Sequence, residues 1–172
     1  MKKLIFTGLL FLSVGLKAQV LPLRQQATVI DEVLSDRLNN LLPTLMEKNG
    51  IDMWVLITRE YNEDPIVKTM LPATWISARR RTILVFYYNP QTKTYKKLAV
   101  ARYSVGNEIK AAWDMKTHPD QWDALTAIIT QYQPKKIGIN TSVNFGHADG
   151  LDHTEYETFK QKLPVSYQSK LV

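Results

Sequence analysis

Apolar side chains recur every three or four residues between residues 29 and 46, with polar residues between them. This spacing is typical of a helix that buries one face. The Asn-Gly pair at 49–50 is a stop signal, and the polar, proline-containing residues 20–28 predict a lead-in. Because Pro43 lacks a backbone N–H group, we expect a kink or a break near Leu42. The apolar positions are Val29, Ile30, Val33, Leu34, Leu38, Leu41, Leu42, Leu45 and Met46.

Four runs of β-forming residues predict strands. Residues 53–58 are almost continuously apolar, which is typical of a strand buried on both faces. Residues 82–88 and 95–103 are rich in β-branched and aromatic side chains, and the turn residues 89–92 lie between them. This arrangement predicts a hairpin. Residues 136–140 predict a further short strand.

Helical patterns alternate with these strands. Residues 65–70 predict a short helix, residues 119–131 carry an apolar stripe, and residues 154–162 predict a last helix. Thr154 and Glu157 have the spacing of a capping box at the start of that helix. The order of elements predicts an α/β fold, with one domain built on a mixed β-sheet flanked by helices.

The first eighteen residues have the composition of a signal peptide. Two lysines precede an apolar run at 4–16, and Ala18 offers a small residue for cleavage. The run is short for a bilayer span, although an uncleaved membrane anchor is the alternative. We therefore expect residues 1–18 to be removed and residues 19–172 to form a soluble, exported domain, periplasmic or secreted. The chain has no cysteine, so its core must hold it together without disulfides.

The net charge of the chain adds little to this interpretation. The three lysines of the signal peptide account for half of the formal charge of +6, which leaves +3 on residues 19–172. The densest basic cluster is at 79–81, with Lys96, Lys97 and Arg102 on the predicted neighbouring strand. Such a patch beside tyrosines is one requirement for binding nucleic acid. Export argues against that partner, so we expect no nucleic-acid binding, and no membrane contact after cleavage.

Residues 106–164 closely resemble the second half of the amino-terminal domain of pita-bread metallopeptidases, the creatinase, prolidase and Xaa-Pro aminopeptidase group. Residues 37–56 resemble the entry of that domain, a helix followed by a Gly-Ile-Asp turn and a hydrophobic strand. Residues 79–86 resemble its second strand. The resemblance implies a ribonuclease-H-like α/β creatinase amino-terminal domain over nearly all of residues 19–172.

In that family, catalysis uses two divalent metal ions, Mn, Co or Zn, held by two Asp, one His and two Glu of a carboxy-terminal domain. None of these ligands maps onto this sequence, so the resemblance implies no catalytic, cofactor-binding or metal-binding residue here. We expect the chain to be inactive alone. The implied role is that of a non-catalytic domain that gives oligomer contacts and walls of the substrate channel. Its partner would be a catalytic peptidase domain or another copy in a homo-oligomer.

Two other interpretations remain open. The same fold can serve as a free-standing exported module that binds a protein or peptide. The polar span at 147–157 can instead be a metal site of an autonomous hydrolase, although acidic residues at a helix start are also explained by the helix dipole. Trp75 and Trp113 lie beside loop signals and are candidate interface residues, with core packing as the alternative. The polar span comprises His147, Asp149, Asp152, His153, Glu155 and Glu157.

Overall fold

In the computed structural model, which describes residues 20–172, five strands form one mixed sheet in the order β4-β3-β2-β1-β5. Strand β1 pairs antiparallel with β2 and β2 with β3, whereas the β1–β5 and β3–β4 pairs are parallel. The expected α/β fold with a mixed sheet is therefore confirmed. The strands are β1 Met53–Arg59, β2 Arg81–Asn89, β3 Thr94–Ala99, β4 Lys110–Ala111 and β5 Ile137–Gly138.

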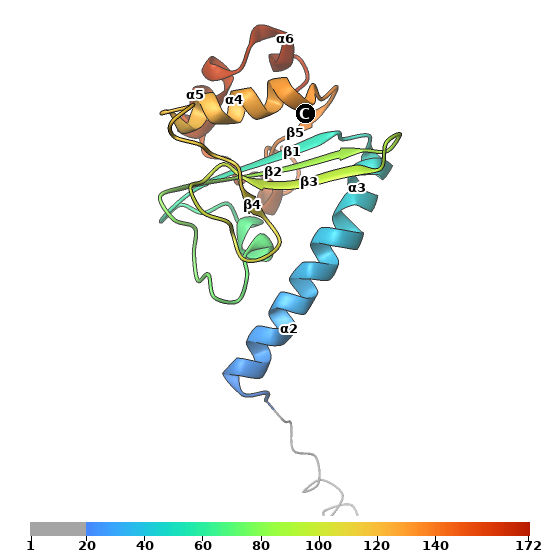
Figure 1. Cartoon of the computed structure of the whole chain (residues 1–172), viewed down its shortest axis with the longest axis vertical. Coiled ribbons are helices and arrows are strands. Elements are labelled where there is room, and N and C mark those ends of the chain that lie inside the picture. The colour runs from blue at the N-terminus through green and yellow to red at the C-terminus, as the bar shows by residue number, and fades with distance from the viewer. Residues whose placement is uncertain (1–19) are drawn as a thin grey trace, which may run out of the picture.

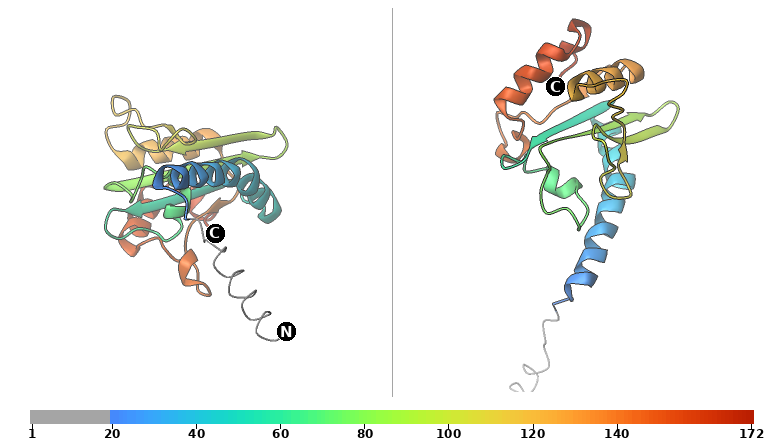
Figure 2. Two further views of the ribbon diagram at one scale, coloured as in Figure 1. Left: turned by 90° about the horizontal axis from the view of Figure 1, so that it is seen from below. Right: turned by 60° about the vertical axis from the view of Figure 1, so that its left-hand side comes forward.

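Helices cover both faces of the sheet (Figure 1). Val55 and Ile57 of β1 pack on the side of α4 and α5, and Leu56 packs on the side of α2 and α3. Strand β1 is thus buried on both faces, as its apolar run predicts. Figure 2 shows α2 and α3 on the opposite side of the sheet from α4 and α5. The helices are α2 Leu23–Asp36, α3 Leu42–Asn49, α4 Gln121–Tyr132, α5 His153–Lys162 and α6 Val165–Gln168.

The first helix begins earlier than the sequence pattern predicts. Residues 20–28 were expected as a lead-in, but α2 starts at Leu23, directly after Pro22. The fixed φ of proline suits a helix start, and the Pro22 carbonyl accepts hydrogen bonds from two of the following amides. The predicted disturbance near Leu42 takes the form of a π-helical turn, Arg37–Leu41, which joins α2 to α3 without breaking the helical run. No helix within residues 20–172 has the length and apolar character needed to cross a membrane.

The hairpin and the later helices also match their predictions, with shifted ends. Strand β3 ends at Ala99 rather than 103, because the chain then bends and returns as the short edge strand β4. The capping-box prediction is wrong: Asp152 caps α5 by accepting a hydrogen bond from the Glu155 amide at 2.9 Å. This cap leaves the Glu155 side chain available for another contact. The predicted signal peptide at 1–18 lies outside the described residues.

Candidate functional site

Two adjoining cavities open beside the end of β1 and the start of β2, with volumes of about 470 and 530 Å³. The first is lined by Trp113 and the second by Trp75, so both candidate interface residues contribute to one concave surface. We call this surface, formed by the lining of both cavities, the arginine groove. The cavities share five lining residues: Glu60, Arg79, Arg80, Arg102 and Tyr103.

The two tryptophans are held in different ways. The ring of Trp75 lies 5.9 Å from that of Tyr103, and the Arg79 guanidinium lies 5.6 Å from the Trp75 ring centre. Trp113 packs against the core on the α4 side and donates its indole N–H to the His118 carbonyl at 2.7 Å. Both side chains are half-buried. Each tryptophan therefore packs partly against neighbouring side chains and partly faces the cavity, where it is exposed to solvent.

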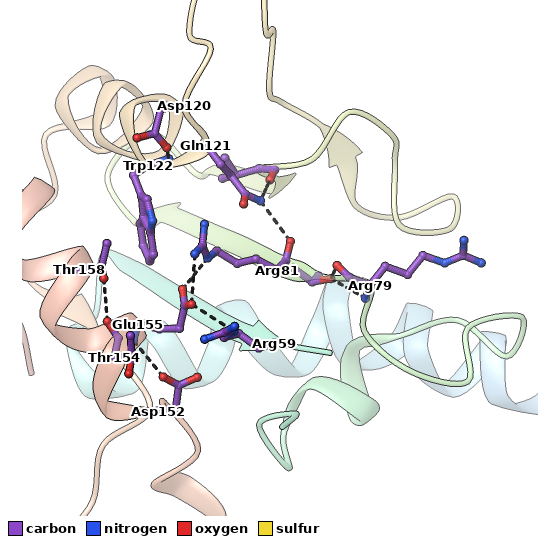
Figure 3. Close-up of polar contacts among 12 residues, drawn as sticks. Arg59, Arg79, Arg81, Asp120, Gln121, Trp122, Asp152, Thr154, Glu155 and Thr158 are labelled. Atoms are coloured by element: carbon purple, nitrogen blue, oxygen red, sulfur yellow. Dashed lines mark hydrogen bonds and ion pairs between the residues drawn. The ribbon is translucent and has the colours of Figure 1, made fainter. Parts of the chain in front are cut away.

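Two arginines of the groove lining, Arg59 and Arg81, pair with a buried carboxylate (Figure 3). Glu155 of α5 is 2% exposed and accepts two hydrogen bonds from Arg81, at 2.5 and 3.2 Å. Arg59 lies 3.5 Å from the same carboxylate, and the Arg81 guanidinium stacks 4.7 Å from the Trp122 ring centre. A buried carboxylate needs such partners, because an unpaired charge in the interior is strongly unfavourable. Glu155 therefore joins α5 to the ends of β1 and β2.

The first turn of α4 fixes the same corner of the groove (Figure 3). The side-chain amide of Gln121 donates to the Val100 carbonyl at 2.6 Å and to the Arg81 carbonyl at 3.2 Å. Asp120 caps α4 through the Trp122 amide and pairs with Lys162 at 2.8 Å. The hydrogen bond from Lys162, with that from the Trp122 amide, holds the pKa of Asp120 below its usual value. These contacts tie β2, β3 and α5 to one helix start.

Two residues of the groove lining have an unusual backbone conformation. Arg80 has a left-handed φ of 49° and Tyr61 one of 69°, conformations that are uncommon for residues other than glycine. Glu60 holds Arg80 in place: its amide donates to the Arg80 carbonyl at 2.6 Å, and its carboxylate accepts from the Arg80 amide at 2.9 Å. Residues held in such conformations cluster at binding and active sites.

No protein-family profile and no curated protein matches the chain. A solved structure shows similarity. It is the Xaa-Pro dipeptidase from Bacillus anthracis, with 14% sequence identity and a TM-score of 0.45. The matched region covers 85% of this chain and 33% of the dipeptidase chain, so this chain spans about a third of the length of that structure. A likeness of this extent assigns neither a function nor a site residue.

The polar span at 147–157 does not form a metal site. Asp152 caps α5 and Glu155 pairs with Arg81. Asp149 accepts from the Ser142 amide at 3.1 Å, and His147 stacks on Phe145. Among residues 20–172, no group of three or more metal-ligating side chains is close enough to hold an ion. The side chains of this span therefore do not fit a metal centre.

The basic residues divide between two surfaces. Arg102 lines the arginine groove with Arg79 and Arg80. Lys97, by contrast, contacts Glu108 and Asn39 on the side of the sheet that carries α2. The predicted single patch is therefore split, because Lys97 lies within β3 whereas Arg102 lies in the loop that follows this strand.

One buried polar cluster was missed by the sequence analysis. Asp64 is fully buried and accepts hydrogen bonds from the Ile66 amide and the Asn140 side chain, both at 2.8 Å. Asn140 accepts in turn from the indole of Trp54 at 2.7 Å. Burial raises the pKa of Asp64, and the two hydrogen bonds it accepts lower it in part. The sequence around Asp64 resembles an exposed charged loop, so local pattern gave no signal for this burial.

A second surface is apolar. Exposed side chains follow one face of α2 and α3, beside the buried stripe that includes Leu38 and Met46. At the end of α3 they adjoin an apolar cavity of about 230 Å³ lined by Trp54, Ile139 and Val172, among others. The first turns of α2 project away from the sheet (Figure 1). The exposed apolar residues of this face are Leu23, Val29, Ile30, Val33, Leu41 and Leu45.

Proposed function

We propose that this chain is the non-catalytic, ribonuclease-H-like amino-terminal domain of an exported Xaa-Pro aminopeptidase or prolidase-like metallopeptidase. It would supply oligomer contacts and part of the wall of a substrate channel to a catalytic domain outside residues 1–172. The single observation that carries the proposal is the position of Trp75 and Trp113. Sequence analysis selects both as interface candidates, and both line one concave surface.

The chemistry of the arginine groove suits a channel wall. Guanidinium groups bind carboxylates through paired hydrogen bonds, and aromatic rings give apolar contact area at a low cost in conformational entropy. Side chains of this kind orient a peptide beside a reacting centre without taking part in the reaction. The metal ions and the activated water would belong to the catalytic domain, as the resemblance of residues 106–164 implies.

The exposed apolar face of α2 and α3 supports the other half of the role. Contiguous apolar surface of this kind is typical of protein–protein contacts. It would contact the catalytic domain or a second copy of the chain. Residues 1–18 would direct the protein across a membrane before removal, so the assembly would work in the periplasm or outside the cell.

The decisive experiment starts from the coding sequence downstream of codon 172 and its neighbouring reading frames. The proposal requires a polypeptide with the Asp, Asp, His, Glu, Glu ligand set in one of them. That polypeptide and the chain are then purified separately and together, and hydrolysis of Xaa-Pro peptides is measured with Mn²⁺ and with a chelator. We expect hydrolysis by the pair and none by the chain. Chelator-sensitive hydrolysis by the pure chain would contradict a non-catalytic role.

A free-standing exported module that binds a protein or peptide is the second candidate. It is favoured by the concave, arginine-lined surface that residues 20–172 already present. The two candidates separate in the same experiment. A gene neighbourhood without the ligand set, together with peptide binding by the chain alone, supports the module.

A further inference from the structure

We infer that the arginine groove binds an acidic peptide segment, in which two or more carboxylates flank an apolar side chain. The inference rests on the proposed function, because it takes the groove to be a surface that faces peptides. It adds the chemical class of the peptide, which neither the resemblance nor the solved structure specifies.

Charge distribution is the first argument. Five arginines line the groove, and their charges are opposed by Glu60 in the wall and by the buried Glu155 beneath it. The groove therefore has a surplus of three positive charges. Residues 20–172 as a whole carry the same surplus, since the three lysines removed with the signal peptide reduce +6 to +3. The rest of the domain has no net charge, so the surplus equals that of the groove lining, whose concave shape strengthens the local potential.

The ion pairs within the domain show which arginine side chains remain available to bind a ligand. Glu155 engages Arg81 and, more weakly, Arg59. Within residues 20–172, no carboxylate lies within ion-pair distance of Arg79, Arg80 or Arg102. Three guanidinium groups without a carboxylate partner, lining both cavities, favour a ligand with several negative charges. A single carboxylate would satisfy only one of them in the bidentate geometry that arginine prefers.

The aromatic rings distinguish a peptide from a nucleic acid. Bases bind to single-strand sites by stacking on open ring faces. Here Arg79 lies over the Trp75 ring, Tyr103 packs against the same ring, and Trp113 is half-buried on the core. The accessible parts of these rings suit apolar contact better than base stacking. Carboxylates on a peptide are therefore the favoured source of negative charge.

An apolar side chain of the ligand also has a place. Ile76 is 92% exposed on the wall of the second cavity, and Tyr61 is 93% exposed on the wall of the first. Both adjoin the arginines. A peptide that alternates acidic and apolar side chains would pair the arginines and cover these two residues together. This combination of arginine and aromatic anchors is enriched at energetically important contacts.

The groove is also pre-organised. Glu60 holds Arg80 in its left-handed backbone conformation through two hydrogen bonds, so the backbone position from which this side chain extends is set before a ligand arrives. Fixing a binding residue in advance reduces the entropy lost on binding.

Fluorescence anisotropy with the purified chain tests this inference. The probes are a fluorescein-labelled Glu-Asp-Leu-Asp-Glu peptide, its uncharged counterpart Gln-Asn-Leu-Asn-Gln, and a labelled oligo-dT of ten nucleotides. We expect the acidic peptide to bind at least about tenfold more tightly than the uncharged one, and binding to weaken with salt. Arg80→Gln and Arg102→Gln should each weaken it about tenfold. Arg24→Gln removes an equal charge from the exposed surface of α2 and is the matched control, expected to stay within about twofold.

Thermal denaturation of each variant shows that a loss of binding is not a loss of folding. Equal affinity for the acidic and uncharged peptides, equal losses in Arg24→Gln and Arg102→Gln, or tighter binding of oligo-dT would each overturn the inference. The two proposals fail separately. If the pair of chain and catalytic polypeptide is active but the chain shows no preference for the acidic peptide, the ligand class alone is wrong. If the chain binds the acidic peptide but no neighbouring reading frame encodes the ligand set, the companion role alone is wrong.

Discussion

Gly150 lies directly against the carboxyl group of Asp64: a Cβ atom at position 150 would be 2.4 Å from Asp64 Cγ. Asp64 cannot move aside easily, because its carboxylate is buried and hydrogen-bonded to Ile66 and Asn140. This contact joins the loop after β5 to the loop after β1. The absence of a side chain at position 150 is therefore a packing requirement.

Gly150→Ala should destabilise the fold by about 2–3 kcal/mol, because the added methyl group overpacks a buried, hydrogen-bonded site. Urea denaturation measures the change. Gly146→Ala is the matched control, since a Cβ at that position meets nothing within 4 Å. We expect the control to stay within about 0.5 kcal/mol of the wild type. Equal effects of the two substitutions would contradict the close approach at Gly150.

Asp64 should make stability depend on pH. Because burial raises its pKa above the ordinary value of 3.8, the folded state binds the proton more tightly than the unfolded state. The resulting stabilisation is complete below 3.8 and is lost as pH rises through the raised pKa. Relative to Asp64→Asn, the wild type should therefore gain stability as pH falls from 7 toward 4. Denaturation of both proteins at each pH measures this difference, and a constant difference would show that Asp64 titrates normally.

Glu155→Gln should cost roughly 3 kcal/mol, because it leaves Arg81 in the groove lining without its counter-charge. The measurement is again chemical denaturation. Glu157→Gln, on the exposed side of the same helix, is the control and should change stability by less than about 0.5 kcal/mol. Replacing Arg81 by Leu in the Glu155→Gln background should recover part of the loss. No recovery would mean that the carboxylate acts through something other than this ion pair.

Asp120→Ala should cost about 1 kcal/mol, because it removes the cap of α4. Asp123 also contacts Lys162, at 3.1 Å, but it caps nothing and half of its side chain is exposed. Its substitution by Ala should therefore cost no more than about 0.5 kcal/mol, as expected for an exposed ion pair. Because Asp120 and Asp123 both pair with Lys162, the difference between the two midpoints of thermal unfolding reports the contribution of the cap. A larger loss in Asp123→Ala would reverse this assignment.

Trp75→Ala should weaken self-association, or docking to a catalytic partner, by about tenfold or more, because large aromatic side chains anchor protein interfaces. Sedimentation velocity and a binding titration measure the effect. Phe145→Ala, which removes an exposed aromatic ring outside the groove, should leave both unchanged. Unchanged sedimentation, unchanged partner affinity and unchanged thermal stability of Trp75→Ala would together exclude a role for this residue.

The sequence by itself determined the elements. Strand β1 is visible as an apolar run, the β2–β3 hairpin as two β-rich runs around turn residues, and α4 as an apolar stripe, because hydrophobic patterning reports directly on which face of a helix or strand is buried. The Asn-Gly stop at the end of α3 and the disturbance before Pro43 are equally local. The prediction of the α5 cap was wrong because two residues near the start of this helix can serve as its cap. Thr154 and Asp152 are both capping residues, and the structure uses Asp152.

Only the tertiary structure decided what the polar residues do. Glu155 and Arg81 are 74 positions apart, and Asp64 and Asn140 are 76 apart. No periodic pattern in the sequence indicates that the residues of either pair are in contact. Trp75 and Trp113 were selected for exposure, but their convergence on one groove depends on how two separate loops meet beside the sheet. The physical reason is that burial of a charge depends on the segments that pack against it, and these are brought together by folding rather than by neighbourhood along the chain.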